Sequence, residues 1–321
     1  MKRIKNKRIA IIGNQWITKY LINKLISYKI KPYLIISSAE NNSKQTSGYS
    51  NLRNIAKKNK IKYFTAENFI ISDELVKKIK KLSLDLAIVY GWQKLVPQTF
   101  INALNENIYG IHGGPFKPPR CKGKAVFNWA IIMGFKKFFL YLFKITNKAD
   151  SGDIVDLAKF DINETDNILS VYEKNCAIST KLILKNLNVI LNKKSKYKKQ
   201  NNNKSTYSLK RIPKNSGIDW TLSSTEIINL VRAVSKPYPS AFTFLRKRKV
   251  FIYEAKLFIG DNFYNNEPGE IVDIFDDSNH FVVKTKDSSI LITSSSLSSK
   301  FLKTGEKFLI RSGVQMPYPN F

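Results

Sequence analysis

From Arg8 to Ile111 the chain alternates between short apolar runs and amphipathic segments, and this alternation constrains the fold more than any other feature. Apolar runs bounded by turn residues indicate buried strands, whereas apolar residues recurring every three to four positions indicate helices. The expected strands are 8–13, 32–37, 61–64, 84–90 and 107–111, and the expected helices are 18–28, 52–59, 72–82 and one that starts near Pro97. Alternating strands and helices predict right-handed crossovers and a mostly parallel sheet covered on both faces. We therefore expect an open, doubly wound, Rossmann-like α/β domain.

The second half of the chain has a different pattern. The segment 192–204 is charged, hydrophilic and of low complexity, which is typical of a linker or an exposed loop. A short helix at 225–234 follows it, and then several short strand-like runs separated by turn residues, which favour a small β-barrel of the OB-like kind. We expect a catalytic domain at 1–190, a basic linker at 191–215 and a C-terminal domain with a helix and a β-barrel at 216–321.

Size and composition restrict the class of protein. The chain has 321 residues, of which 43% are hydrophobic, enough for two domains with buried cores. No apolar run approaches the roughly 20 residues that a membrane-spanning helix needs, and the N-terminus does not have the pattern of a secretory signal. We expect a soluble, cytoplasmic protein without membrane association. Cys121 and Cys176 form no motif with metal-ligand spacing, so we expect neither a metal site nor a disulfide framework.

The formal net charge of +30 bears on the choice of partner. A strongly basic chain suits a polyanion such as tRNA. Here, however, lysines are spread through helices, strands and the linker alike, with no arginine-rich stripe, which favours a compositional origin of the charge. The charge alone therefore does not identify a partner, and the sequence leaves the formation of a homodimer open.

Ligands of open α/β sheets bind at the carboxyl ends of the strands. The turn after the first expected strand, Gly13-Asn14-Gln15-Trp16, is not a GxGxxG motif, and the chain contains no GxxxxGK[ST] motif, which argues against a dinucleotide or P-loop site. Asn14, the turn Tyr90-Gly91-Trp92 and the turn after Ile111 are therefore the places where a ligand is expected.

Histidine supplies the most specific indication, because the chain has only two. His280 lies in an ordinary expected strand, whereas His112 follows the strand 107–111 at the carboxyl edge of the sheet. An imidazole exchanges protons near neutral pH, as acyl transfer requires. Asp150, in Asp150-Ser151-Gly152-Asp153-Ile154, is the candidate carboxylate partner, provided that a helix at 125–134 and a strand at 138–145 return the chain to His112.

These segments carry a resemblance to a known family. Gly110-Ile111-His112-Gly113-Gly114-Pro115, then the segment 122–130 (KGKAVFNWA), then 150–154 (DSGDI) resemble, in order and in spacing, the folate-dependent formyltransferases. That family includes methionyl-tRNA formyltransferase, glycinamide ribonucleotide formyltransferase and the sugar-nucleotide N-formyltransferases. The segments 211–220 and 230–242 are similar to the start of the family's second domain, so the resemblance covers most of the chain.

The resemblance implies transfer of a formyl group from N10-formyltetrahydrofolate, the co-substrate, to an amine. It implies that His112 and Asp150 are catalytic. By the same resemblance, the residues expected to bind the folate are Val89, Tyr90, Gly91, Trp92, Ala149 and Gly152. The residues expected to bind the acceptor are Asn14, Gly113, Gly114, Pro115, Lys122 and Lys124.

The chain departs from the family pattern at two positions. Gly110 stands where the family has an asparagine whose amide donates to the developing oxyanion, and Lys122 stands where it has an arginine. Loss of an oxyanion donor costs on the order of 10²–10³ in rate. Either another donor, such as Lys124, Asn128 or an N–H of Gly113 or Gly114, substitutes for it, or the site is weakened or inactive.

For the acceptor, the resemblance favours an amino-sugar nucleotide, as used in cell-surface polysaccharide synthesis. The segment 211–220 (RIPKNSGIDW) is more similar to the sugar formyltransferases than to the tRNA enzyme, and we expect Lys122 and Lys124 to meet a diphosphate. Two alternatives stay open. One is the formylation of methionyl-tRNA, and the other is a catalytically disabled protein that binds folate or a sugar nucleotide.

Overall fold

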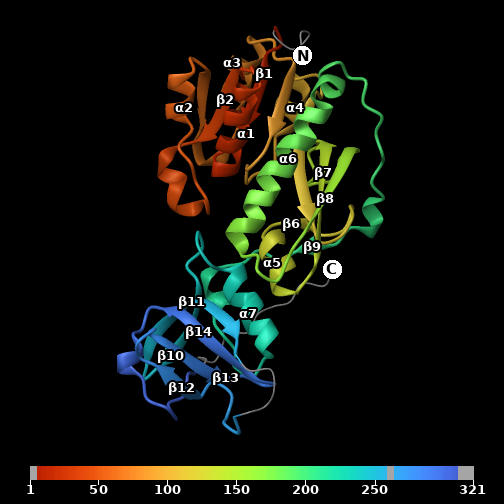
Figure 1. Ribbon diagram of the computed structural model, residues 1–321. Coiled ribbons are helices and arrows are strands. Elements are labelled where there is room, and N and C mark those ends of the chain that lie inside the picture. The colour runs from red at the N-terminus through yellow and green to blue at the C-terminus, as the bar shows by residue number, and fades with distance from the viewer. Residues whose placement is uncertain (1–5, 259–263, 310–321) are drawn as a thin grey trace. The chain divides into compact units, whose positions relative to one another are not determined.

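The computed structural model describes residues 6–258 and 264–309 (Figure 1). The chain divides into two compact units. The first consists of Met1–Gly123, Lys137–Phe160 and Tyr172–Thr206, and the second of Lys124–Lys136, Asp161–Val171 and Tyr207–Phe321. The chain thus passes between the units several times.

The first unit is built on a seven-stranded sheet with the strand order β3-β2-β1-β4-β5-β7-β8. Its strands are β1 Ile9–Ile12, β2 Leu34–Ser38, β3 Lys62–Ala66, β4 Leu86–Val89, β5 Ile108–Gly114, β7 Lys137–Lys144 and β8 Ile154–Asp161. The strands from β3 to β5 run parallel, and β7 lies antiparallel against β5. The expected doubly wound, mostly parallel sheet is confirmed.

Alternation of side chains along each strand produces two hydrophobic cores, one on each face of the sheet. Ile9 and Ile11 of β1 face a core that contains residues of α1 (Trp16–Ser27), α2 (Arg53–Lys58) and α6 (Ile168–Leu191). Ala10 and Ile12 face the opposite core, which contains residues of α3 (Asp73–Lys80) and α4 (Gln98–Ala103). Figure 1 shows α1 and α6 in front of the sheet. The near-continuous apolar runs in the sequence exist because both faces are covered.

Local sequence also sets the ends of the helices. Ser72 caps α3, because its hydroxyl accepts a hydrogen bond from the Leu75 N–H. Asp73 and Glu74 occupy the first turn, where negative side chains stabilise the helix dipole. The expected start of this helix is confirmed.

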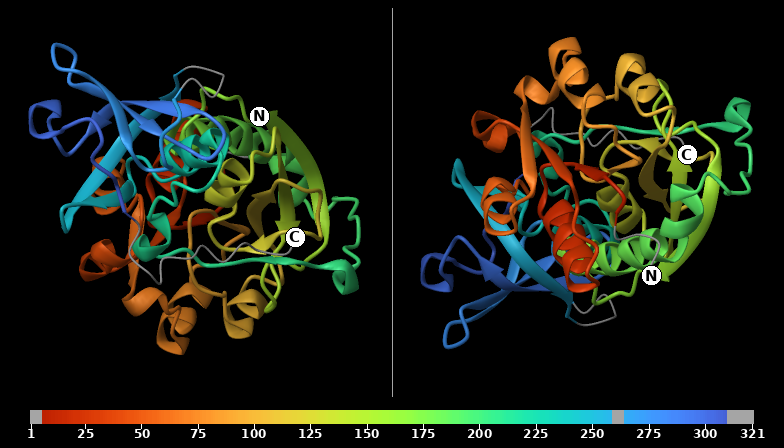
Figure 2. Two further views of the ribbon diagram at one scale, coloured as in Figure 1. Left: turned by 90° about the horizontal axis from the view of Figure 1, so that it is seen from below. Right: turned by 90° about the horizontal axis from the view of Figure 1, so that it is seen from above.

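The second unit contains a five-stranded antiparallel sheet with the order β10-β11-β14-β13-β12. Its strands are β10 Ala241–Leu245, β11 Arg248–Leu257, β12 Ile271–Phe275, β13 His280–Lys284 and β14 Ser289–Ser295, and its helices are α5 Val126–Ile132 and α7 Ser224–Ala233. Register shifts in β11 and β12 mark bulges, which bend strands, and Figure 2 shows the curvature of this sheet. Leu309 forms a β-bridge with Phe244 of β10, and Lys307 forms one with Glu270, the residue before β12. The same segment therefore links both edges of the sheet, as in a small barrel.

Phe308 lies in that closing segment and fills the core of the sheet. It is 1% exposed, and its ring stacks on Trp220 at a centroid distance of 5.6 Å and an interplanar angle of 19°. Phe281 packs on its ring at 5.9 Å. The closure of the sheet therefore depends on burial of one aromatic side chain.

We expect Phe308→Ala to lower the free energy of unfolding by about 3–5 kcal/mol, because it leaves a cavity between two aromatic rings. Phe301→Ala is the matched control, since Phe301 is 66% exposed, and it should change stability by less than about 0.5 kcal/mol. Urea unfolding of both variants measures the difference. Equal losses would show that Phe308 does not close the sheet.

The sequence did not predict β8, the long helix α6, β10 or the two-residue strand β6 Lys122–Gly123. The segment expected as a linker at 191–215 also has structure of its own. It contains the 3₁₀ helices Asn202–Lys204 and, running just beyond its end, Pro213–Ser216, and the short strand β9 Tyr207–Ser208. The domain limits 1–190, 191–215 and 216–321 stay a prediction. In the described part of the chain, no helix is both long and apolar enough to cross a membrane.

Candidate functional site

The candidate site lies where β5 continues past the end of β4. Val89, the last residue of β4, pairs with Gly110, and beyond it β5 pairs only with β7. The expected strand end at Ile111 is therefore too early, because β5 continues to Gly114. His112 lies in this extension with a side chain that is 12% exposed. It is thus held by a strand pair at the carboxyl edge of the parallel sheet, where ligands of this fold class bind.

Both ring nitrogens of His112 face oxygen atoms. Nδ1 lies 3.6 Å from Oδ2 of Asp150, and Nε2 lies 3.2 Å from the carbonyl oxygen of Cys121. A neutral imidazole donates through one nitrogen only, whereas an imidazolium donates through both. The two oxygen atoms on opposite sides of the ring therefore hold the imidazole of His112 in one orientation. The sequence had singled out both residues, and the structure brings them together.

Asp150 is placed by a tight turn between β7 and β8. Its backbone has φ +50°, in the left-handed region. Its carboxylate accepts a hydrogen bond of 3.2 Å from the Gly123 N–H, which fixes Oδ2 on the side of His112. Gly152 is required in this turn, because a Cβ there would overlap the carbonyl group of Lys144. The expected role of Gly152 in binding folate stays a prediction, whereas its role in allowing the close approach to Lys144 follows from the structure.

The polar segment 197–206, which we name the strap, binds this turn from the other side. The side-chain amide of Gln200 donates to the carbonyl oxygens of Asp150, at 3.0 Å, and Gly152, at 2.6 Å. Lys198 exchanges two backbone hydrogen bonds with Ile154, at 2.9 and 2.8 Å. A stretch that composition had marked as a linker or exposed loop therefore holds the candidate catalytic carboxylate in place.

Lys122 is enclosed by the protein. Its side chain is fully buried. The ammonium donates to Ser151 Oγ at 3.0 Å and to Asn202 Oδ1 at 2.6 Å, joining the Asp150 turn to the strap. Burial lowers the pKa of Lys122, and the charge of Asp150 opposes this shift. These hydrogen bonds position the turn, and the expected contact of Lys122 with a diphosphate stays a prediction.

The position of the family asparagine is filled by apolar side chains. A Cβ on Gly110 would lie 2.7 Å from Ile145 Cδ1 and 3.3 Å from the Phe143 ring. Phe143 is the residue opposite Gly110 in the β5–β7 pair. The chain has therefore not only lost the amide but has packed its place with hydrocarbon.

Two buried groups next to the site were missed by sequence reasoning or given no role. Burial raises the pKa of the Cys121 thiol to about 12, so it stays protonated and does not act as a nucleophile. Tyr141 lies opposite His112 in the strand pair, with ring centroids 5.6 Å apart. Burial raises the pKa of its phenol well above the ordinary value, and the hydroxyl has no hydrogen-bond partner within residues 6–258 and 264–309. Only the register of an antiparallel pair, which the sequence does not give, could have identified it.

The turn after β4 has features of a binding edge. Gly91 has φ +74°, and the indole N–H of Trp92 is buried without an acceptor in the described part of the chain. Tyr90 is instead part of the core, and its hydroxyl accepts a hydrogen bond from Asn175 at 2.9 Å. Val89 and Ala149 are half-buried. An unused donor fits a ligand rich in acceptor atoms, such as a folate.

The residues expected to bind the acceptor are mostly explained by packing. Gly113 and Gly114 allow the close approach of β7 and Cys121, and Pro115 is buried. Asn14 is also buried, and its amide donates to Ser38 Oγ at 2.9 Å. Lys124 is exposed but belongs to the second unit. Binding roles for these residues stay predictions. Over residues 6–258 and 264–309, no cluster of three His, Cys, Asp or Glu side chains could hold a metal ion.

Gln200→Ala removes both hydrogen bonds between the strap and the Asp150 turn. We expect it to lower the free energy of unfolding by about 1–2 kcal/mol, the usual contribution of two partly buried hydrogen bonds. Lys199→Ala is the neighbouring control, because Lys199 is exposed. Urea unfolding of both variants measures the loss. If the two variants are equally stable, the strap does not hold the turn.

Comparison with known proteins covers both units. Residues 7–187 match the family model described as formyl transferase, and residues 211–312 match that of the formyl transferase C-terminal domain. A methionyl-tRNA formyltransferase from Fusobacterium nucleatum is 30% identical over 272 residues, which cover 81% of this chain and 86% of that protein.

Solved structures share the fold. The sugar 3N-formyltransferase WlaRD, solved in the presence of dTDP and 5-N-formyl-THF, aligns with a TM-score of 0.67 at 20% identity, covering 90% of this chain and 98% of that one. The N-formyltransferase from Helicobacter canadensis, in complex with folinic acid and dTDP-3-aminofucose, aligns with a TM-score of 0.66 at 21% identity, covering 89% and 98%.

Proposed function

This chain belongs to the formyl transferase family, and we propose that it transfers the formyl group of N10-formyltetrahydrofolate to the amine of an amino-sugar nucleotide. The observation that carries the proposal is the contact between His112 and Asp150 at the carboxyl edge of the sheet. The two residues to which the proposal gives catalytic roles lie together, and the turn that presents Asp150 is bound on both sides.

In the proposed reaction, the amine nitrogen attacks the formyl carbon and forms a tetrahedral intermediate. The bond from that carbon to N10 of the folate then breaks, leaving a formamide and tetrahydrofolate. His112 stabilises the oxyanion and delivers a proton to N10, while Asp150 orients His112 and assists removal of the proton that the amine loses. Protons balance, because the amine loses one and N10 gains one.

The donor is proposed from the family and from the turn after β4. Two structural neighbours are described with a formylated folate, 5-N-formyl-THF in one and folinic acid in the other. In this chain, the positive φ of Gly91 and the unused indole N–H of Trp92 suit a ligand with several acceptors. Trp92 is therefore the residue that we expect to hold the folate.

The amino-sugar acceptor rests on the segment 211–220, whose sequence is more similar to that of the sugar enzymes, and on the sugar formyltransferases among the structural neighbours. Release of tetrahydrofolate, with a panel of amino-sugar nucleotides offered as acceptors, tests the proposal. Turnover with one of them supports it. Turnover with methionyl-tRNA alone would assign the other acceptor.

Methionyl-tRNA is the second candidate acceptor. A methionyl-tRNA formyltransferase is 30% identical to this chain in an alignment that covers 81% of it. The net charge of +30 also suits a polyanion. If tRNA is the substrate, its affinity should fall steeply with added salt, since phosphate contacts release counterions.

We expect His112→Ala to lower the rate of tetrahydrofolate release by about 10²–10⁴, because it removes the proton donor. Asp150→Asn should lower kcat while leaving the KM for folate nearly unchanged, because Asp150 acts through His112. Stopped-flow or single-turnover assays separate the two effects. The control is His280→Ala, the only other histidine. Near-normal turnover of His112→Ala would contradict the proposed roles.

The other alternative, a catalytically disabled protein, is tested at Gly110. Gly110→Asn alone should destabilise the chain by roughly 1–3 kcal/mol, because the new side chain meets Ile145. Combined with Ile145→Ala, it gains room and restores an oxyanion donor, so turnover should rise by up to about 10².

Ile145→Ala alone is the matched control, because it opens the same space without an amide. If the double variant turns over no faster than this control, the missing asparagine does not limit the reaction. If the wild-type chain binds folate but is silent with every acceptor while the double variant turns over, the natural protein is the disabled form.

A further inference from the structure

A cavity of about 490 Å³ lies in the first unit, away from the candidate catalytic site. Its eight lining residues are Asn6, Lys7, Arg8, Lys31, Pro32, Tyr33, Lys60 and Lys62. Arg8, Tyr33 and Lys62 come from the amino ends of β1, β2 and β3, whereas His112 stands at the carboxyl edge of the same sheet. The cavity is therefore a separate site on the opposite edge, and the proposed reaction does not use it.

The lining of this cavity is strongly basic and has no acidic member. Lys7 is compensated by Asp85, at 2.8 Å from its ammonium. Asp85 also accepts a hydrogen bond from the backbone N–H of Arg8, at 2.8 Å. Among the described residues, the Arg8 guanidinium and the ammonium groups of Lys31, Lys60 and Lys62 form no ion pair with a carboxylate. Like charges gathered in one concave place repel one another and raise the local concentration of anions.

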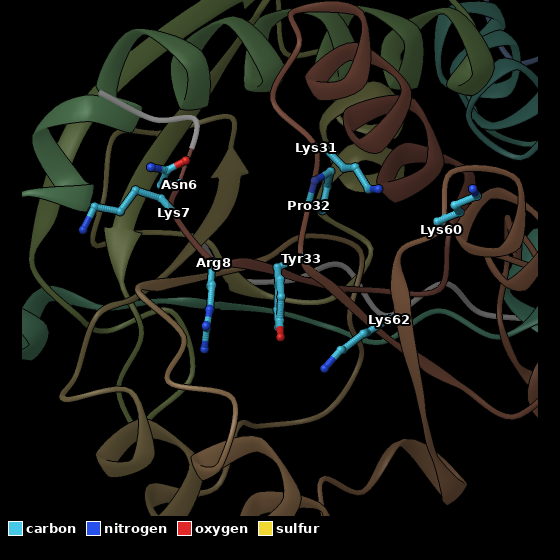
Figure 3. A pocket seen from close by; sticks show the side chains of 8 residues that line it. All are labelled: Asn6, Lys7, Arg8, Lys31, Pro32, Tyr33, Lys60 and Lys62. Carbon is cyan, nitrogen blue, oxygen red and sulfur yellow. The ribbon is translucent and has the colours of Figure 1, made fainter. Parts of the chain in front are cut away.

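Tyr33 organises two of these cations. The Arg8 guanidinium lies 5.2 Å from the ring centroid, and the Lys62 ammonium lies 5.0 Å from it. Figure 3 shows the Arg8, Tyr33 and Lys62 side chains next to one another and pointing in the same direction. The Arg8 guanidinium is further held by the carbonyl oxygen of Leu82, at 2.8 Å. Cations ordered in advance lose less entropy when a ligand binds.

The chemistry of the lining selects the ligand. A fork of guanidinium donors next to ammonium groups matches phosphate oxygens. The ring of Tyr33 is already engaged by its own two cations, so it does not offer a free face to a nucleobase. The volume is within the range of about 300–1,000 Å³ found for small-molecule sites. These features favour a compact anion with several phosphate charges over an extended nucleic acid.

We propose that this cavity is a second ligand site that binds a compact diphosphate-type anion through Arg8 and Lys62. Tyr33 positions both cations. The Lys62 hydrogen bond and charge, together with the charge of Arg8, lower the pKa of the Tyr33 phenol, which makes its O–H a better donor to a phosphate oxygen.

Equilibrium dialysis of the full chain against inorganic pyrophosphate tests this proposal. The double variant Arg8→Gln/Lys62→Gln should lose one equivalent of bound pyrophosphate, or bind it at least about tenfold more weakly, since charge-assisted hydrogen bonds are the strong ones. Lys77→Gln/Lys80→Gln is the matched control, because it removes two charges from the exposed end of α3. The control should bind like the wild type.

Three results would overturn the proposal. They are no binding of pyrophosphate, equal binding by the double variant and the wild type, and equal weakening in the double variant and the control. Binding of a single-stranded RNA oligomer with the same dependence on Arg8 and Lys62, but none of pyrophosphate, would replace the compact anion with RNA. Should the double variant fail to fold, Lys62→Gln alone serves, because Lys62 is exposed at the start of β3.

Discussion

The antiparallel pairing of β7 with β5 is the constraint on which the candidate site depends. A parallel sheet continued by another crossover would carry the chain away from the end of β5. Here the chain comes back along β5 instead, with Tyr141 opposite His112, and the connection 145–153 then leads into β8. That connection carries Asp150, which is how a carboxylate far along the chain reaches the imidazole. Loss of this pairing would separate the two groups, whatever their own side chains do.

Holding the turn has an electrostatic cost that the surrounding polar groups offset. Asp150 has a left-handed backbone and sits near a fully buried ammonium, that of Lys122. A buried charge is tolerated only when it is paired or hydrogen-bonded. Ser151 and Asn202 accept from Lys122, and Gln200 binds the turn's carbonyl groups, so the strap supplies the partners that burial requires. The site therefore requires polar side chains in the strap.

The sequence predicted the parallel sheet well, because burial on both faces leaves an apolar run in every strand and a periodic face on every helix. That His112 and Asp150 lie close together was also predictable, from residue type, place in the fold and the family resemblance. Contacts that depend on which residues pair between distant strands were not predictable. The burial of Lys122 was not predicted, because the residues next to it in the sequence give no sign of the strap that covers it.

The contacts made by the segment 191–215 were not predictable, for the same reason. Low complexity and charge are typical of a linker, yet Gln200 and Asn202 use their amides on a turn that lies far away in the sequence. Gly110 shows the opposite case. The missing asparagine was visible in the sequence, but only the structure shows that Ile145 and Phe143 have filled its place.

The measurement that tests the central claim most directly is ¹⁵N NMR of the histidine rings, in the wild type and in Asp150→Ala. With only two histidines, His280 serves as an internal reference. If Asp150 orients His112, the wild type should carry a proton on Nδ1 of His112, and Asp150→Ala should change the ring ¹⁵N shifts of His112 while those of His280 stay the same. Identical His112 shifts in the two proteins would mean that the contact does not set the state of the imidazole.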